Sequence, residues 1–170
     1  MFVDALTSWA HAAAIVLFPL LMIFAALKDA SSMTIPNWIP ASLIGVFLLV
    51  SWLLIGPGEV AQHLIVGAAV LIACFSMFAL NWIGGGDAKL LAAGALWVGW
   101  TGLGDFVIWT AIAGGGLSLA LILARKIAVM SPIGLGNGPV GRLLTSGGDI
   151  PYGLAIAAGG LAAFPKSGLV

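Results

Sequence analysis

Long uncharged stretches, broken by single charged residues, are the main pattern of this sequence. Six stretches enclose 23, 29, 27, 15, 19 and 16 uncharged residues, and they follow Asp4, Asp29, Glu59, Lys89, Asp105 and Asp149. A membrane helix needs roughly 17–25 apolar residues to cross about 30 Å of hydrocarbon. We therefore expect an all-α membrane protein whose six transmembrane helices form one transmembrane domain over residues 1–170. The expected helices span residues of about 8–27, 39–56, 62–82, 88–103, 106–124 and 150–165.

The composition supports this interpretation and excludes several classes of protein. Of the 170 residues, 62% are hydrophobic and 7% are charged, whereas a soluble domain carries about 25% charge. A soluble enzyme and a disordered chain are therefore excluded. Six Lys and Arg balance six Asp and Glu, so the chain has no basic surplus with which to bind nucleic acid. The single cysteine, Cys74, excludes a disulfide framework and a thiolate metal cluster, and we expect no metal and no cofactor.

The positions of Lys and Arg predict the orientation of the chain in the lipid bilayer. Six helices place both termini on one side and distribute the loops alternately. One side receives the loops at 28–38, 83–89 and 125–149, with five cations: Lys28, Lys89, Arg125, Lys126 and Arg142. The other side has only Lys166. We therefore expect the N-terminus outside and the three basic loops in the cytoplasm.

Three of the six acids fall on the expected outer side, in short connections or at the terminus, where we interpret them as solvated loop residues: Asp4, Glu59 and Asp105. On the cytoplasmic side, Asp29 ends the first helix, where a carboxylate opposes the helix dipole. A surface ion pair with Lys28 is the alternative interpretation of Asp29. Asp149 precedes a helix with Pro151 in its first turn, and we interpret it as an N-cap.

The third cytoplasmic acid, Asp87, follows three consecutive glycines, Gly84, Gly85 and Gly86, which interrupt an apolar run. Glycine can adopt positive φ and lets other backbone approach closely. In a membrane such backbone is buried in protein or lines a water-filled cavity, and an ionisable group beside it is a functional candidate. The alternative interpretation of Asp87 is an ordinary N-cap that opens the fourth helix.

Two acids on one side of the membrane suggest carboxylate-pair chemistry at Asp29 and Asp87. Two carboxyls that share a site do not both ionise, so one is an anion and the other keeps a proton. The anion accepts a proton from water, the water attacks a carbonyl, and the protonated partner stabilises the resulting oxyanion. This scheme hydrolyses a peptide bond without a metal. His11 and His63 are expected near the outer face, far from these acids.

Three motifs in this order resemble the type IV prepilin peptidases, which are GxGD-type intramembrane aspartyl proteases. The motifs are Asp29 followed by Ile35-Pro36-Asn37, then Gly84-Gly85-Gly86-Asp87-Ala88-Lys89-Leu90, then Pro151-Tyr152-Gly153-Leu154-Ala155-Ile156-Ala157. The resemblance implies that Asp29 and Asp87 are the catalytic pair. It also implies a supporting role for the other motif residues Pro36, Asn37, Gly84, Gly85, Gly86 and Lys89.

The same resemblance implies the substrate and the location. The substrate is a prepilin whose basic leader lies in the cytoplasm and is cut just before the apolar stem, and the enzyme lies in the bacterial inner membrane. The length of the chain resembles the short form that serves Flp/Tad pili. Longer relatives carry a cytoplasmic insertion with paired cysteines and N-methylate the new terminus. This chain has no such insertion, so we expect no methyltransferase activity.

A different class of function stays open alongside this one. A small non-enzymatic transporter or channel subunit would use Asp87 as an ion or proton site, but the chain has no recognisable internal repeat to favour a transporter. Other glycines predict close helix–helix contacts: Gly114, Gly115, Gly116, Gly153, Gly159 and Gly160. Residues 131–148 hold six Gly and two Pro, so we expect a mobile loop there.

Overall fold

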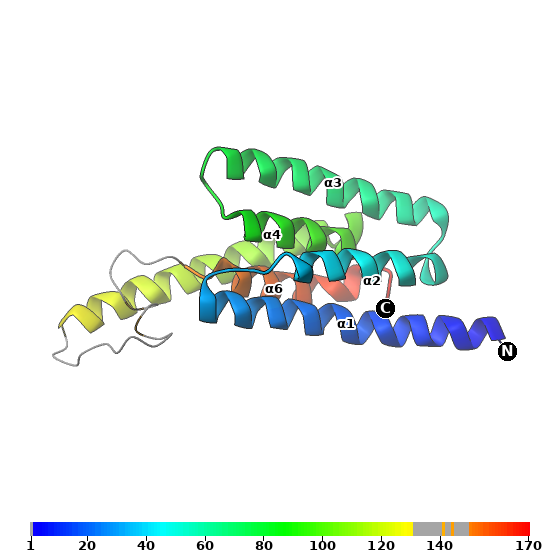
Figure 1. The fold of residues 1–170 in the computed structure, drawn as a ribbon, viewed down its shortest axis with the longest axis horizontal. Coiled ribbons are helices and arrows are strands. Elements are labelled where there is room, and N and C mark those ends of the chain that lie inside the picture. The colour runs from blue at the N-terminus through cyan, green and yellow to red at the C-terminus, as the bar shows by residue number, and fades with distance from the viewer. Residues whose placement is uncertain (1, 131–140, 142–143, 145–149) are drawn as a thin grey trace.

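A computed structural model describes residues 2–130, 141, 144 and 150–170. This part of the chain is a helical bundle without strands, which confirms the all-α prediction (Figure 1). Its helices are α1 (Phe2–Ser32), α2 (Trp38–Leu54), α3 (Pro57–Ala79), α4 (Gly85–Met130), α6 (Tyr152–Ala163) and the short 3₁₀ helix η1 (Phe164–Lys166). Three of them are long and apolar enough to cross a membrane, namely α1, α3 and α4. The chain is a membrane protein, whereas six spans and an outer N-terminus stay predictions.

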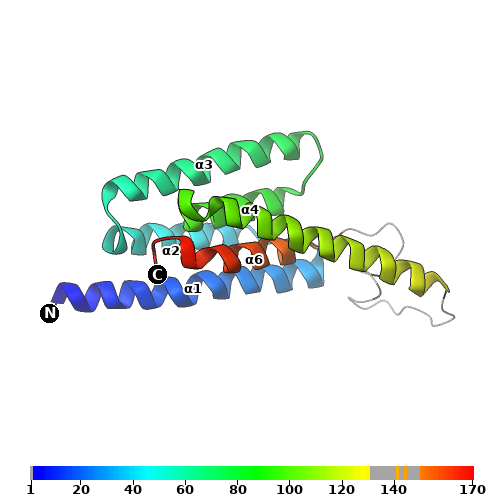
Figure 2. The ribbon, with the colours of Figure 1, turned by 180° about the vertical axis from the view of Figure 1, so that it is seen from behind.

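A break at Gly99 divides α4 into two segments. Gly99 has φ 62° and ψ −167° inside the otherwise helical run. After the break the second segment runs back past the first, toward the end of the bundle where α4 begins (Figures 1 and 2). The sequence predicted two helices here with a connection at 104–105, and that boundary is wrong. The chain turns at Gly99 because a residue without a Cβ adopts positive φ without strain.

The three acids expected in solvated loops or at the terminus lie in helices instead. Asp4 and Glu59 occupy the first turns of α1 and α3, where the helix dipole favours a negative charge. The Glu59 carboxylate also accepts a hydrogen bond of 3.2 Å from the N–H of Gly56. Asp105 lies within the second segment of α4 and forms an ion pair with Lys166. These three acids therefore do not mark connections between helices. Two of them lie at helix starts, and the third is paired with a lysine.

An aromatic cluster joins the helices at the centre of the bundle. The ring of Phe18 lies 5.0 Å from that of Trp97 and 4.5 Å from that of Phe164, between ring centroids. The indole N–H of Trp97 donates to the carbonyl oxygen of Leu43 across 2.9 Å. These contacts connect α1, α2, the first segment of α4 and η1, and they fix the helices that carry the site.

Glycines bring α6 close to its neighbours, as the sequence predicted for most of them. A Cβ at position 159 would collide with Thr110 of α4, and one at position 160 with Met22 of α1. At Gly114 a Cβ would lie 2.9 Å from the Tyr152 ring. The prediction is wrong for Gly115 and Gly116, because a Cβ at either would meet open space.

Candidate active site

The last turn of α1 carries Asp29 into the interior. The residue is only 6% exposed. Its backbone carbonyl accepts a hydrogen bond from the N–H of Met33 across 2.8 Å, just where α1 ends. Met33 itself has φ 54°, and this left-handed residue turns the chain out of the helix. Burial excludes the alternative interpretation of Asp29 as one partner of a surface ion pair with Lys28.

The carboxylate of Asp29 is bound by the start of α6. The N–H of Gly153 donates to Oδ2 of Asp29 across 2.7 Å, in a buried hydrogen bond. A Cβ at position 153 would lie 2.8 Å from both Cβ and Oδ2 of Asp29, closer than real Cβ contacts come. Only glycine therefore lets α6 approach the aspartate at this distance.

Asp87 is the third residue of α4, after Gly85 and Gly86, and it is partly buried. Its side chain accepts no hydrogen bond from the described residues, so it is not the N-cap that the alternative interpretation required. None of the three glycines before it has positive φ, which corrects the expectation of left-handed backbone there. Their role is close approach: a Cβ at Gly86 would lie 3.2 Å from Cβ of Ile35, and one at Gly84 would lie 3.1 Å from Oδ2 of Asp87.

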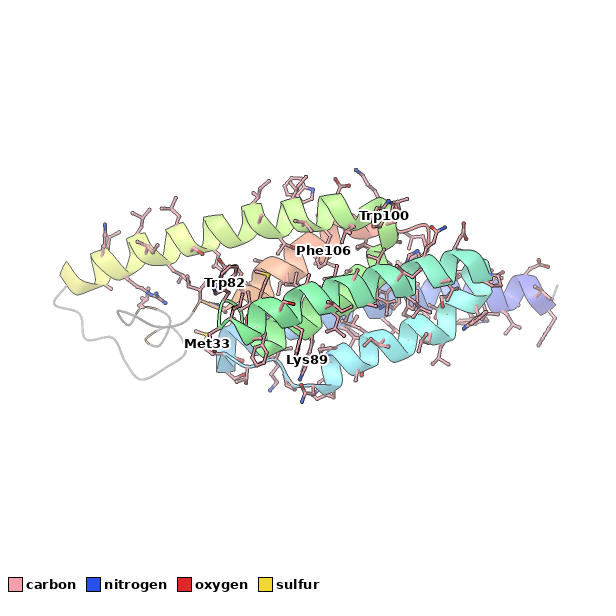
Figure 3. The ribbon with its side chains drawn as sticks, turned by 90° about the horizontal axis from the view of Figure 1, so that it is seen from above. Met33, Trp82, Lys89, Trp100 and Phe106 are labelled. Carbon is pink, nitrogen blue, oxygen red and sulfur yellow. The ribbon has the colours of Figure 1, made fainter. Side chains whose placement is uncertain are left out.

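The two aspartates line the same space. A cavity of about 850 Å³ has both of them in its lining, together with residues from α1, α3, both segments of α4 and α6. A smaller cavity of about 260 Å³ is lined by Asp29 and Asp87 as well, with the segment 33–35 and the three glycines. Met33 and Trp82, which line the larger cavity, lie at one end of the bundle, and Trp100 lies toward the other (Figure 3).

The surroundings of the pair are mostly apolar and carry no compensating cation. The described residues that line the two cavities include no Lys, Arg or His, and Tyr152 is the other titratable group among them. Negative charges on two carboxyls that line one mostly apolar cavity would repel each other, which disfavours ionisation of both at once. We expect the pair to hold one proton, which is the condition for one acid to act as base while the other donates.

Other motif residues meet on the opposite side of α4. The ammonium of Lys89 donates to Oδ1 of Asn37 across 2.8 Å, and both residues line a separate apolar cavity of about 400 Å³ between α2, α3 and α4. Figure 3 shows Lys89 on the side away from the second segment of α4. The carbonyl of Pro36 accepts from the N–H of Ile39 across 3.1 Å and so opens α2. These contacts hold the α1–α2 connection against the start of α4.

Some features of the site had no usable signal in the sequence. Gly153 belonged to a recognised motif, but its bond to Asp29 depends on the separation of α1 and α6. Met33 and Asn81 both line the larger cavity with positive φ. Asparagine is enriched in this conformation, whereas a methionine gives no signal of it. Asp149 and most of the expected loop at 131–148 lie outside the described residues. Within the described ranges, no three His, Cys, Asp or Glu residues gather to hold a metal ion.

One comparison with known proteins gives a match. A family model described as the type IV leader peptidase family matches residues 16–119, a range that contains both Asp29 and Asp87. No curated protein and no solved structure matches the chain.

Proposed function

The chain belongs to the type IV leader peptidase family, and on this premise we propose that it is an aspartyl endopeptidase that removes the leader peptide from a prepilin. The observation that carries the proposal is the shared cavity of Asp29 and Asp87. These two acids are far apart in sequence, on α1 and α4, and they meet among apolar walls. A peptide bond placed between them would have a base on one side and an acid on the other.

The proposed reaction is a water attack that the pair drives. One aspartate is an anion and takes a proton from water while the water oxygen bonds to the scissile carbonyl carbon. The protonated aspartate gives its proton to the carbonyl oxygen, which yields a neutral tetrahedral diol. When the C–N bond breaks, the first aspartate returns its proton to the leaving nitrogen. The second then recovers a proton from the remaining hydroxyl, and the pair is restored.

The location belongs to the same proposal. We place the protein in the bacterial inner membrane, with the outer N-terminus and the cytoplasmic site that the five-to-one distribution of cations supports. Lys28 lies next to Asp29 in sequence, and Lys89 follows Asp87 by two residues, so the site lies at the basic end of its helices. A basic leader in the cytoplasm and an apolar stem in the membrane would meet at this boundary. A single transmembrane domain over residues 1–170 and a prepilin of the Flp/Tad type belong to the same proposal.

The alternative of a non-enzymatic transporter or channel subunit is not favoured. The family is one of peptidases, and an ion site at Asp87 alone would leave Asp29 in the same cavity without a role.

Co-expression of the chain with candidate prepilins tests the proposal directly. An immunoblot for the pilin reports the size shift on leader removal, and N-terminal sequencing of the product locates the cut. We expect a shortened pilin only when the wild-type chain is present. If no candidate is shortened at normal levels of inserted protein, the proposed function is wrong.

A further inference from the structure

The two aspartates of the pair have different hydrogen-bond environments. Oδ2 of Asp29 accepts the N–H of Gly153 across 2.7 Å. The side chain of Asp87 accepts no hydrogen bond from any part of the chain that the structure describes. A hydrogen bond to a carboxylate favours the charged form over the neutral form. The geometry therefore separates two groups that the sequence treats as equivalent.

The position of Gly153 in α6 adds to this difference. It is the second residue of α6, which begins at Tyr152 and continues for 12 residues. The first N–H groups of a helix have no intrahelical acceptor, and the helix dipole is positive at this end. Both effects favour a negative charge on Asp29. The other titratable groups that face it in the cavity are Asp87 from α4 and Tyr152 from α6.

Resting on the function proposed above, we propose that Gly153 is a positioning residue that keeps Asp29 as the ionised member of the pair. Asp29 is then the base that takes the proton from water, and Asp87 begins the cycle protonated and gives its proton to the carbonyl oxygen. Because Gly153 occupies Oδ2, the proton from water goes to Oδ1 of Asp29. The same oxygen returns this proton to the leaving nitrogen when the C–N bond breaks.

Group-specific labelling of the wild-type protein tests the assignment without any mutation. An epoxide is opened by a carboxylate anion, whose oxygen attacks the ring carbon while the C–O bond breaks and the alkoxide takes a proton from water. A diazo compound instead takes the proton of a carboxylic acid, loses N₂ and esterifies the same group. Peptide mapping by mass spectrometry locates each ester. We expect the epoxide on Asp29 and the diazo product on Asp87; the reverse pattern, or both labels on one residue, would overturn the assignment.

A backbone ester at position 153 tests the role of the N–H itself. Translation with glycolic acid in place of Gly153 replaces the N–H by an oxygen and adds no side-chain atom. The matched control replaces Leu154 by its α-hydroxy analogue. The N–H that this control removes donates to the Pro151 carbonyl across 3.3 Å and not to Asp29. Without the N–H of Gly153 the charged form of Asp29 is less favoured. We therefore expect the acid limb of the pH profile of kcat/KM to move up by about one pH unit for the 153 ester only. We expect kcat to fall while KM is retained.

The outcomes separate this proposal from the function on which it rests. Asp29→Asn and Asp87→Asn are assayed beside the esters. Cleavage by either variant would refute the aspartyl mechanism itself. If both variants are inactive and the 153 ester keeps the wild-type acid limb, the mechanism stands and only the role of Gly153 is overturned. An equal shift of the acid limb in the 154 ester would also overturn the role of Gly153.

Discussion

The Nδ1–H of His63 donates to the carbonyl oxygen of Leu96 across 2.8 Å, in the interior of the bundle. Leu96 lies three residues before Gly99, where positive φ interrupts the helical geometry that would bring an N–H to this carbonyl. His63 supplies a donor to the backbone beside this break, and its ring stacks on Phe47 with centroids 5.5 Å apart. A side chain of α3 thus satisfies the broken backbone of α4.

Replacing Gly99 by alanine is expected to destabilise the protein. The new Cβ would lie 2.5 Å from Cε1 of His63, and φ 62° is unfavourable for alanine. Strain of this kind costs about 1–3 kcal/mol before the collision is counted, so we expect Tm to fall by several degrees in detergent. Gly104→Ala is the control, since it has helical backbone and open space. Equal Tm values for the two variants would contradict this account of the break.

Gly86→Val is expected to reduce cleavage at least about tenfold, because small displacements of a reacting group cost that much or more. A Cβ at this position would already lie 3.2 Å from Cβ of Ile35, and the methyl groups of valine would push the start of α4 away from the α1–α2 connection. The measurement is the processed fraction of a prepilin at matched enzyme levels. Gly115→Ala, which meets open space, is expected to process normally. Wild-type activity in Gly86→Val would show that this contact does not position Asp87.

A bulky residue in the wall of the larger cavity is expected to block the substrate. Leu91 follows Asp87 on the first segment of α4 and lines the same cavity as the two acids. Leu91→Trp would therefore fill the space beside them. We expect cleavage to fall about tenfold or more. Leu71→Trp fills the separate cavity between α2, α3 and α4 and serves as the control. Equal loss in both variants would mean that the larger cavity is not where the substrate binds.

The proposed orientation has a direct chemical test. On a Cys74→Ala background, Ser8→Cys and Ser31→Cys each supply one exposed thiol near opposite ends of α1. A membrane-impermeant maleimide on intact cells is expected to label the cysteine at 8, and to label the one at 31 only after permeabilisation. The reverse pattern would place the N-terminus in the cytoplasm and contradict the proposal.

Charge spacing predicted the helical class correctly because charged residues are excluded from long apolar segments. The charge-spacing prediction failed at the break in α4 because the sequence around Asp105 does not show that Lys166 is its partner. The ion pair with Lys166 allows this acid to stay within a helix. Gly99 is one of 24 glycines, and nothing in the neighbouring sequence marks it as the residue with positive φ at which α4 breaks.

The pairing of Asp29 with Asp87 was a hypothesis from the chemistry of two acids, and the structure brings both to one cavity. Their catalytic role stays a prediction. The bond from Gly153 could not be predicted, because it depends on how closely α6 approaches α1. That distance is set by packing at several glycines, such as Gly160 against Met22, and not by the motif around Gly153.

The central claim is that Asp29 and Asp87 together hydrolyse the leader peptide bond. It is tested most directly with purified enzyme in liposomes, a prepilin substrate and mass spectrometry of the product. Asp105→Asn is the matched control, because it removes an acid that is paired with Lys166 rather than placed in the cavity. We predict that Asp29→Asn and Asp87→Asn each lower kcat/KM at least about 100-fold while Asp105→Asn stays near wild type. Cleavage at the wild-type rate by either cavity variant would contradict the account.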